Sequence, residues 1–103
     1  MKKVAVIQDM SSFGKCSLTA AIPVLSVMGI QACPLPTAVL TAQTAYPSFY
    51  VKDLTDEMNH FTTQWSKMGE SFDGIQTGFV TGKEQIEHMF VYIFSKKDVF
   101  QNV

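Results

Sequence analysis

The sequence predicts an α/β protein built from three β-α units around a parallel sheet. Short apolar runs, typical of strands buried on both faces, alternate with segments whose apolar residues recur at helical intervals. Glycines or polar residues separate these segments. Strands that alternate with helices pair in parallel through right-handed crossovers. The chain has 103 residues, so we expect a single small domain.

The first unit begins with an apolar run that predicts a strand near residues 3–8. A polar stretch leads from it to a helix expected near residues 17–29, and Gly29 is a suitable stop. Pro23 fits poorly inside a helix, so the helix either starts late, near Ala20, or kinks at the proline.

The second and third units follow the same pattern. Strands are expected near residues 31–40 and 73–79, and helices near 54–68 and 83–95. Asp53 precedes the first of these helices and is a residue type that caps helices. Prolines in the second strand suit a sheet edge or the entrance of a strand.

Charge and composition exclude several function classes. Eight basic and nine acidic residues give a net charge of −1, so nothing indicates binding to nucleic acid or to an anionic membrane. No apolar run approaches the roughly 20 residues of a spanning helix, and no signal-peptide core is evident. We therefore expect a cytoplasmic protein. Its two cysteines match no metal or redox motif and are expected to be reduced.

Ligands of parallel α/β sheets bind beyond the carboxyl ends of the strands. This rule selects residues 8–15, 41–48 and 77–82, which are also the most polar or glycine-bearing junctions. We expect a small-molecule site where these three segments meet.

The candidate site residues in these segments are Asp9, Ser12, Gln43, Thr44 and Phe79. Asp9 can accept hydrogen bonds from a ligand, help to hold a metal, or cap the next turn. Gln43 and Thr44 offer donors and acceptors to a ligand, although such residues also occur in solvated loops. Phe79 can stack on a ring or pack under the last helix.

Two other candidate sites, a phosphate loop and a metal site, lack the residues that they need. Gly14 and Lys15 suggest a phosphate loop, but that motif needs a glycine where Asp9 stands and a hydroxyl residue where Cys16 stands. His60 and His88 have no second ligand at a metal-binding spacing. We therefore assign no catalytic residue and no metal site.

Several stretches resemble the start of a pyridoxal kinase, a member of the ribokinase-like group. They are residues 4–14 (VAVIQDMSSFG), 20–23 (AAIP), 27–29 (VMG), 33–40 (CPLPTAVL), 77–79 (TGF) and 84–88 (EQIEH). Thr44 matches a family threonine that contacts the substrate. At the position of Asp9, many members have a serine that contacts the pyridine ring of the substrate. An Asp at this position is similar to a related bacterial branch of the family. Ala42 and Gln43 replace the usual Asn and His.

The resemblance implies transfer of a phosphoryl group from ATP, with Mg²⁺, to the 5′-hydroxyl of a vitamin B6 compound, for pyridoxal phosphate salvage. In the family, the nucleotide site and the catalytic Asp lie further along than residue 103. We therefore expect a truncated, N-terminal, vitamin-binding part of the fold, with a next strand beginning within residues 95–103. Alone, it should bind neither ATP nor Mg²⁺ and should have no kinase activity.

The resemblance also implies partners, because family members form homodimers. We expect an uncovered strand edge, exposed helix faces and association with itself or with a full-length kinase. Three alternatives stay open: a hydroxymethylpyrimidine kinase-like fragment, a non-catalytic interaction subunit, and a flavodoxin-like or receiver-like module. A receiver has an acidic cluster after its first strand, whereas Asp9 has no acidic neighbour.

Overall fold

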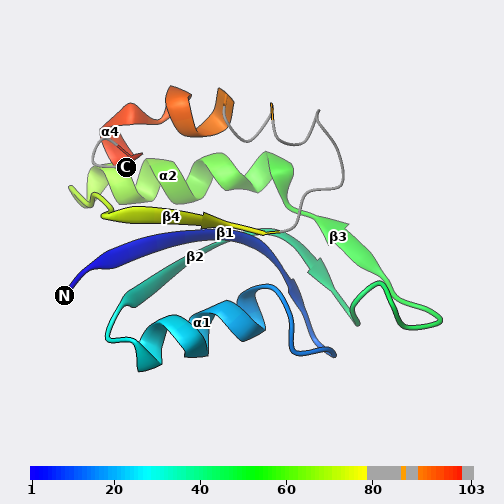
Figure 1. Ribbon diagram of the computed structural model, residues 1–103. Coiled ribbons are helices and arrows are strands. Elements are labelled where there is room, and N and C mark those ends of the chain that lie inside the picture. The colour runs from blue at the N-terminus through cyan, green and yellow to red at the C-terminus, as the bar shows by residue number, and fades with distance from the viewer. Residues whose placement is uncertain (79–86, 88–90, 101–103) are drawn as a thin grey trace.

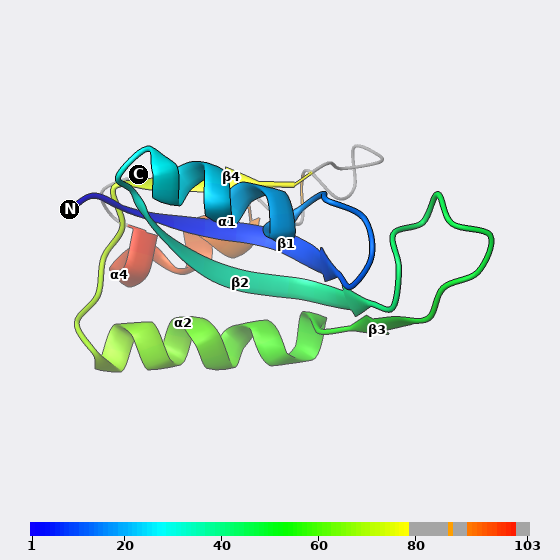
Figure 2. The same cartoon turned by 90° about the horizontal axis from the view of Figure 1, so that it is seen from below.

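The fold is a four-stranded sheet with helices on both faces, as the computed structural model shows (Figures 1 and 2). The structure describes residues 1–78, 87 and 91–100. The strands are β1 (Lys3–Ser11), β2 (Gln31–Leu40), β3 (Val51–Asp53) and β4 (Gly74–Thr77), in the order β3-β2-β1-β4. Helix α1 (Leu18–Val27) covers one face, and α2 (Met58–Lys67) and α4 (Lys97–Phe100) cover the other.

Strand β1 is the centre of the sheet and confirms the predicted parallel core. It pairs in parallel with both β2 and β4. Ala5, Val6 and Ile7 are at most 1% exposed, because helices cover both faces of this strand. The unbroken apolar run in the sequence reflects this double burial.

The strand ends differ from the prediction in two places. β1 continues to Ser11, so Asp9 lies within the strand, because Met10 and Ser11 pair with the carboxyl end of β2. The short strand β3 was not predicted. It pairs antiparallel with residues 38–40, and its three exposed residues carry no periodic signal.

The prolines occupy tolerated places. Pro34 and Pro36 precede the part of β2 that pairs with β3. Among the described residues, this half of β2 pairs only with β1 and forms an edge of the sheet, where prolines are tolerated. Helix α1 begins at Leu18 and contains Pro23. Of the two predicted options, the late start near Ala20 is therefore wrong.

The connection into α2 starts at Asp53, as predicted, but through a 3₁₀ turn (Thr55–Glu57). The Asp53 carboxylate accepts hydrogen bonds from the Thr55 N–H and hydroxyl groups, and the hydroxyl bond holds the pKa of Asp53 below its usual range. The predicted helix near residues 83–95 is helical at residues 87 and 91–95, while residues 83–86 and 88–90 lie outside the described residues.

The core lies between the sheet and the α2 side. Its buried members are Ala5, Ile7, Leu35, Met58, Phe72, Val99 and Phe100. The Phe72 ring lies 4.7 Å from that of Trp65 and 6.0 Å from that of Phe100, between ring centroids. The strand expected to begin within residues 95–103 does not begin at residues 95–100, because Val99 and Phe100 enter this core from a helical turn, α4, while residues 101–103 lie outside the described residues.

Apolar side chains also lie on the outer face of α1. Val24, Val27 and Met28 are 59%, 90% and 65% exposed. This agrees with the expected exposed helix face, while the expected association stays a prediction. None of the helices in the described part of the chain is long and apolar enough to cross a membrane.

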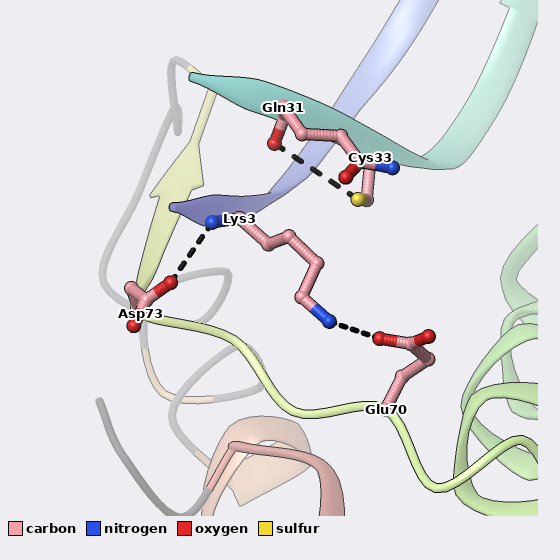
Figure 3. A network of polar contacts seen from close by, with 5 residues as sticks. All are labelled: Lys3, Gln31, Cys33, Glu70 and Asp73. Carbon is pink, nitrogen blue, oxygen red and sulfur yellow. Dashed lines mark hydrogen bonds and ion pairs between the residues drawn. The ribbon is translucent and has the colours of Figure 1, made fainter. Parts of the chain in front are cut away.

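A polar network ties the amino end of the sheet to the α2–β4 connection (Figure 3). The Lys3 ammonium group forms an ion pair with Glu70, and this bond raises its pKa. The Lys3 backbone N–H donates to Asp73 Oδ2 at 2.9 Å. Cys33 lies beside this network with its Sγ 3.9 Å from the Gln31 carbonyl oxygen. Burial raises the pKa of the Cys33 thiol, and the Lys3 charge opposes that shift.

The burial of Val99 predicts a matched difference between two valines. Val99→Ala should lower the free energy of unfolding by about 2 kcal/mol, from two lost methyl groups and the cavity they leave. Val27→Ala, at a 90% exposed position, should change it by less than about 0.5 kcal/mol. Urea denaturation monitored by circular dichroism measures both. Equal effects would contradict the placement of α4 in the core.

The raised pKa of Cys33 predicts slow alkylation. Only the thiolate reacts, so at pH 8 iodoacetamide should modify Cys33 more slowly in the folded chain than in urea. The pH–rate profile of folded Cys33 should be displaced to higher pH, which separates the pKa effect from restricted access. Lys3→Met should displace it further. Peptide mass spectrometry gives the rates, and identical folded and unfolded profiles would exclude this account.

Candidate functional site

The loops that follow β1 and β2 meet at the carboxyl end of the sheet. The Ser12 N–H donates to the Leu40 carbonyl at 2.9 Å, so the two strands leave the sheet together. One residue beyond Ser12, the Phe13 carbonyl accepts the Gln43 N–H at 2.9 Å. The second of these bonds joins the predicted segments 8–15 and 41–48, and the first joins segment 8–15 to the end of β2.

A glycine makes this junction close. Gly14 has φ +102°, and a Cβ atom built on it would lie 2.5 Å from Gln43 Cγ and 3.1 Å from Gln43 Cβ. No side chain fits there without moving Gln43. The aliphatic part of Gln43 thus packs directly on the backbone of the β1 loop.

Asp9 is bonded to the start of α1. The Ser17 hydroxyl donates to Asp9 Oδ1 at 2.7 Å. Ser17 has φ 51° and ψ −130°, and it is the one residue other than glycine with positive φ in the described ranges 1–78, 87 and 91–100. Such a backbone is strained for a residue with a side chain.

The turn between Gly14 and Ser17 is closed by local hydrogen bonds. The Cys16 N–H donates to the Gly14 carbonyl at 3.0 Å, and the Thr19 hydroxyl donates to the Cys16 carbonyl at 2.7 Å. The loop is therefore held at both ends, by Gln43 and by the first turn of α1.

The end of β4 lies against β1 on the other side. The Gly78 N–H donates to the Ile7 carbonyl at 3.2 Å, and a Cβ atom on Gly78 would lie 3.1 Å from Gln8 Cγ. Gln8 is 7% exposed. Sequence reasoning did not single out Gln8, although a lone amide at the end of an apolar run was a usable signal.

The structure brings together some of the predicted site residues. Asp9, Ser12 and Gln43 belong to the joined loops and the adjoining strand end, as the contacts above show. Thr44 is exposed in the turn next to Gln43. Phe79 lies outside the described residues, so its predicted place at the site is not described.

The joined loops carry exposed aromatic side chains. Phe13 is in the β1 loop, and Tyr46, Phe49 and Tyr50 are in the loop that leads to β3. The Tyr50 N–H donates to the Thr41 hydroxyl at 2.8 Å, which closes the base of that loop. Aromatic side chains in these loops are of a kind that suits an aromatic ligand.

The described residues also include candidate metal and phosphate ligands. Within them, no group of three or more His, Cys, Asp or Glu side chains could hold a metal ion. His60 is exposed, and His88 lies outside the described residues. Lys15 is exposed in a loop without a phosphate-binding motif. We assign no step of phosphoryl transfer to them.

A cavity of about 270 Å³ lies elsewhere, on the helical layer. It is lined by Thr62, Thr63, Ser66, Lys67, Ser95 and Lys96. None of these residues belongs to the strand ends, so the cavity is separate from the candidate site.

The tight contact at Gly14 predicts the effect of adding one methyl group. Gly14→Ala should cost more stability than Gly29→Ala, because both positions have positive φ but only Gly14 has atoms within 4 Å of the new Cβ. The backbone cost common to both is about 1–2 kcal/mol. Gln43→Ala should recover part of the extra loss at Gly14. Urea denaturation of the two single variants and the double variant tests this, and equal losses at Gly14 and Gly29 would refute the close approach.

Solved structures share this fold and part of this sequence. A Bacteroides thetaiotaomicron protein named as a phosphomethylpyrimidine kinase is 47% identical, with a TM-score of 0.81, over 91% of this chain and 33% of its own. One crystal form of that protein contains pyridoxal. Pyridoxal kinase from Lactobacillus plantarum is 27% identical, with a TM-score of 0.78, over 92% of this chain and 34% of its own. Pyridoxal kinase from Trypanosoma brucei (19% identity, TM-score 0.74, 94% of this chain and 36% of its own) shares the fold.

The match covers nearly all of this chain but only about a third of each of these proteins. No family model and no curated protein matches the sequence. Identity of 47% together with the shared topology is beyond what fold alone explains. The chain therefore belongs to the ribokinase-like family that includes these pyridoxal kinases, and it spans about one third of their length.

Proposed function

We propose that these 103 residues form the vitamin-binding part of a pyridoxal kinase, which phosphorylates the 5′-hydroxyl of a vitamin B6 compound in pyridoxal phosphate salvage. The observation that carries the proposal is the 47% identity to a protein with a pyridoxal-containing crystal form. The joined loops at the strand ends support it independently, because ligands of parallel α/β sheets bind there.

The residue types of the site suit a substituted pyridine. The Asp9 carboxylate can accept a hydrogen bond from a ring hydroxyl or from a protonated ring nitrogen. Ser12 and Thr44 supply hydroxyl groups, and Gln43 supplies an amide. Phe79, by its sequence position after β4, is proposed to stack on the ring. The exposed aromatic residues nearby would exclude water from one side of such a ligand.

Phosphoryl transfer itself is proposed for a complete family protein. It depends on positioning ATP and on neutralising the charge of the transferred group with Mg²⁺ and N–H donors. We propose that this chain contributes binding and orientation of the alcohol. We propose a cytoplasmic location and pairing with itself or with a full-length kinase.

A hydroxymethylpyrimidine is the second candidate substrate. The neighbour with 47% identity is named as a phosphomethylpyrimidine kinase. Both candidate ligands are aromatic nitrogen heterocycles that carry a hydroxymethyl group, so the same loop could hold either.

Binding measurements on the full chain separate these two substrates. Pyridoxine is the better probe of the first, because it lacks the aldehyde with which pyridoxal reacts with lysines. Calorimetry should show tighter binding of pyridoxine than of hydroxymethylpyrimidine. The opposite order would favour the second substrate, and binding of neither would refute the proposed site.

Thr44→Ala should weaken pyridoxine binding by a few-fold to about tenfold, the value of one hydrogen bond to a neutral ligand. Thr63→Ala is the matched control, because Thr63 is an exposed threonine on α2, away from the strand ends.

A coupled assay of the chain with ATP, Mg²⁺ and each B6 vitamer should show no turnover. Turnover above background after removal of host kinase would contradict the assignment of binding alone.

A further inference from the structure

The geometry at Ser17 is costly in two separate ways. Its backbone lies in a region that residues with a side chain rarely adopt, at φ 51° and ψ −130°. It also stands at the N-cap of α1, where a serine oxygen normally accepts a hydrogen bond from an N–H of the first turn. Ser17 makes no such bond.

Both costs coincide with one contact. The Ser17 hydroxyl donates to Asp9 Oδ1 at 2.7 Å, which joins β1 to the start of α1 across the turn of residues 12–16. The hydroxyl therefore points to β1, and it makes no bond to the first turn of its own helix. Strain that persists at a single residue is typical of ligand clamps and active sites, where the surroundings hold it in place.

The bonded carboxylate belongs to the candidate site. Asp9 is the one carboxyl residue among the proposed vitamin-binding residues, and a carboxyl group whose rotation is restricted loses less freedom when a ligand binds. The turn that Ser17 closes also carries Gly14, on which Gln43 packs. One hydrogen bond thus orients Asp9 and anchors the loop that contacts Gln43.

We propose that Ser17 is a positioning residue of the vitamin site. Its hydroxyl fixes the Asp9 carboxylate, and its strained backbone gives the 12–16 loop the direction that brings Gly14 against Gln43. Ser17 itself touches no ligand in this account. The inference rests on the proposed function for its effect on vitamin binding, but the anchoring of the loop can be measured without any ligand.

Two substitutions separate the hydroxyl from the strain. Ser17→Gly removes the hydroxyl and relieves the backbone, whereas Ser17→Ala removes the hydroxyl and keeps the strain. Ser17→Gly should therefore unfold at the same temperature as the wild type or a higher one, while pyridoxine binds about tenfold more weakly, as expected for a lost hydrogen bond to a charged group. A loss of binding without a loss of stability is not expected of a merely structural residue.

The dependence on Asp9 is tested by a double-mutant cycle. In an Asp9→Ala background, Ser17→Gly should change the dissociation constant for pyridoxine by less than about twofold, because Ser17 acts through Asp9. Ser26→Ala is the matched control: it removes another α1 hydroxyl, which donates to the Ile22 carbonyl. It should leave binding unchanged. Full, additive effects of Ser17→Gly and Asp9→Ala would overturn the proposal.

Amide hydrogen exchange on the ligand-free chain tests the loop anchor. The Gln43 N–H, which donates to Phe13, should exchange about tenfold faster in Ser17→Gly and in Asp9→Ala, and at the wild-type rate in Ser26→Ala. Unchanged exchange in the first two variants would overturn the proposal. Faster exchange in a chain that binds no pyridoxine would uphold the anchor and refute the proposed function, so the two failures are distinct.

Discussion

The burial of β1 on both faces and along both edges is the constraint on which the rest of the structure depends. Ala5, Val6 and Ile7 are closed off by helices on both sides of the sheet and by β2 and β4 on either edge. A strand in this position is apolar along its covered length. Polar residues begin at Gln8, and although Gln8 and Ser11 are still buried, Met10 and Ser12 are exposed. The candidate site is therefore where the central strand leaves its own core.

Glycines then decide how closely the segments around β1 approach. Gly14 and Gly78 each lie against a glutamine side chain: a Cβ atom on Gly14 would lie 2.5 Å from Gln43 Cγ, and one on Gly78 would make a tight contact of 3.1 Å with Gln8 Cγ. In both pairs the aliphatic part of the glutamine packs on backbone. The amide groups of these side chains are held near the strand ends as a consequence of packing.

The sequence predicted the parallel core because its signal is burial, which periodicity reports directly. The strands, the helices and the strand-end location of the site followed from that signal. It did not predict β3, whose exposed residues 51–53 have no apolar face, nor the helical turn at Val99 and Phe100, which is too short to show a period. The bond between Ser17 and Asp9 was also beyond reach, because side-chain pairing across a turn leaves no periodic trace.

The hydrogen bond from Ser17 is compatible with two of the roles expected of Asp9, holding the next turn and accepting hydrogen bonds from a ligand. A carboxylate has two oxygens and several acceptor sites, and Oδ1 accepts the Ser17 hydroxyl. Helix capping in its usual form would place the bond within α1 and leave the strand end unrestrained. By accepting from Ser17, Asp9 fixes the turn through the same bond that limits its own rotation. Holding the loop and presenting the carboxylate proposed to bind the ligand are then two consequences of one contact, and a substitution at either residue acts on both.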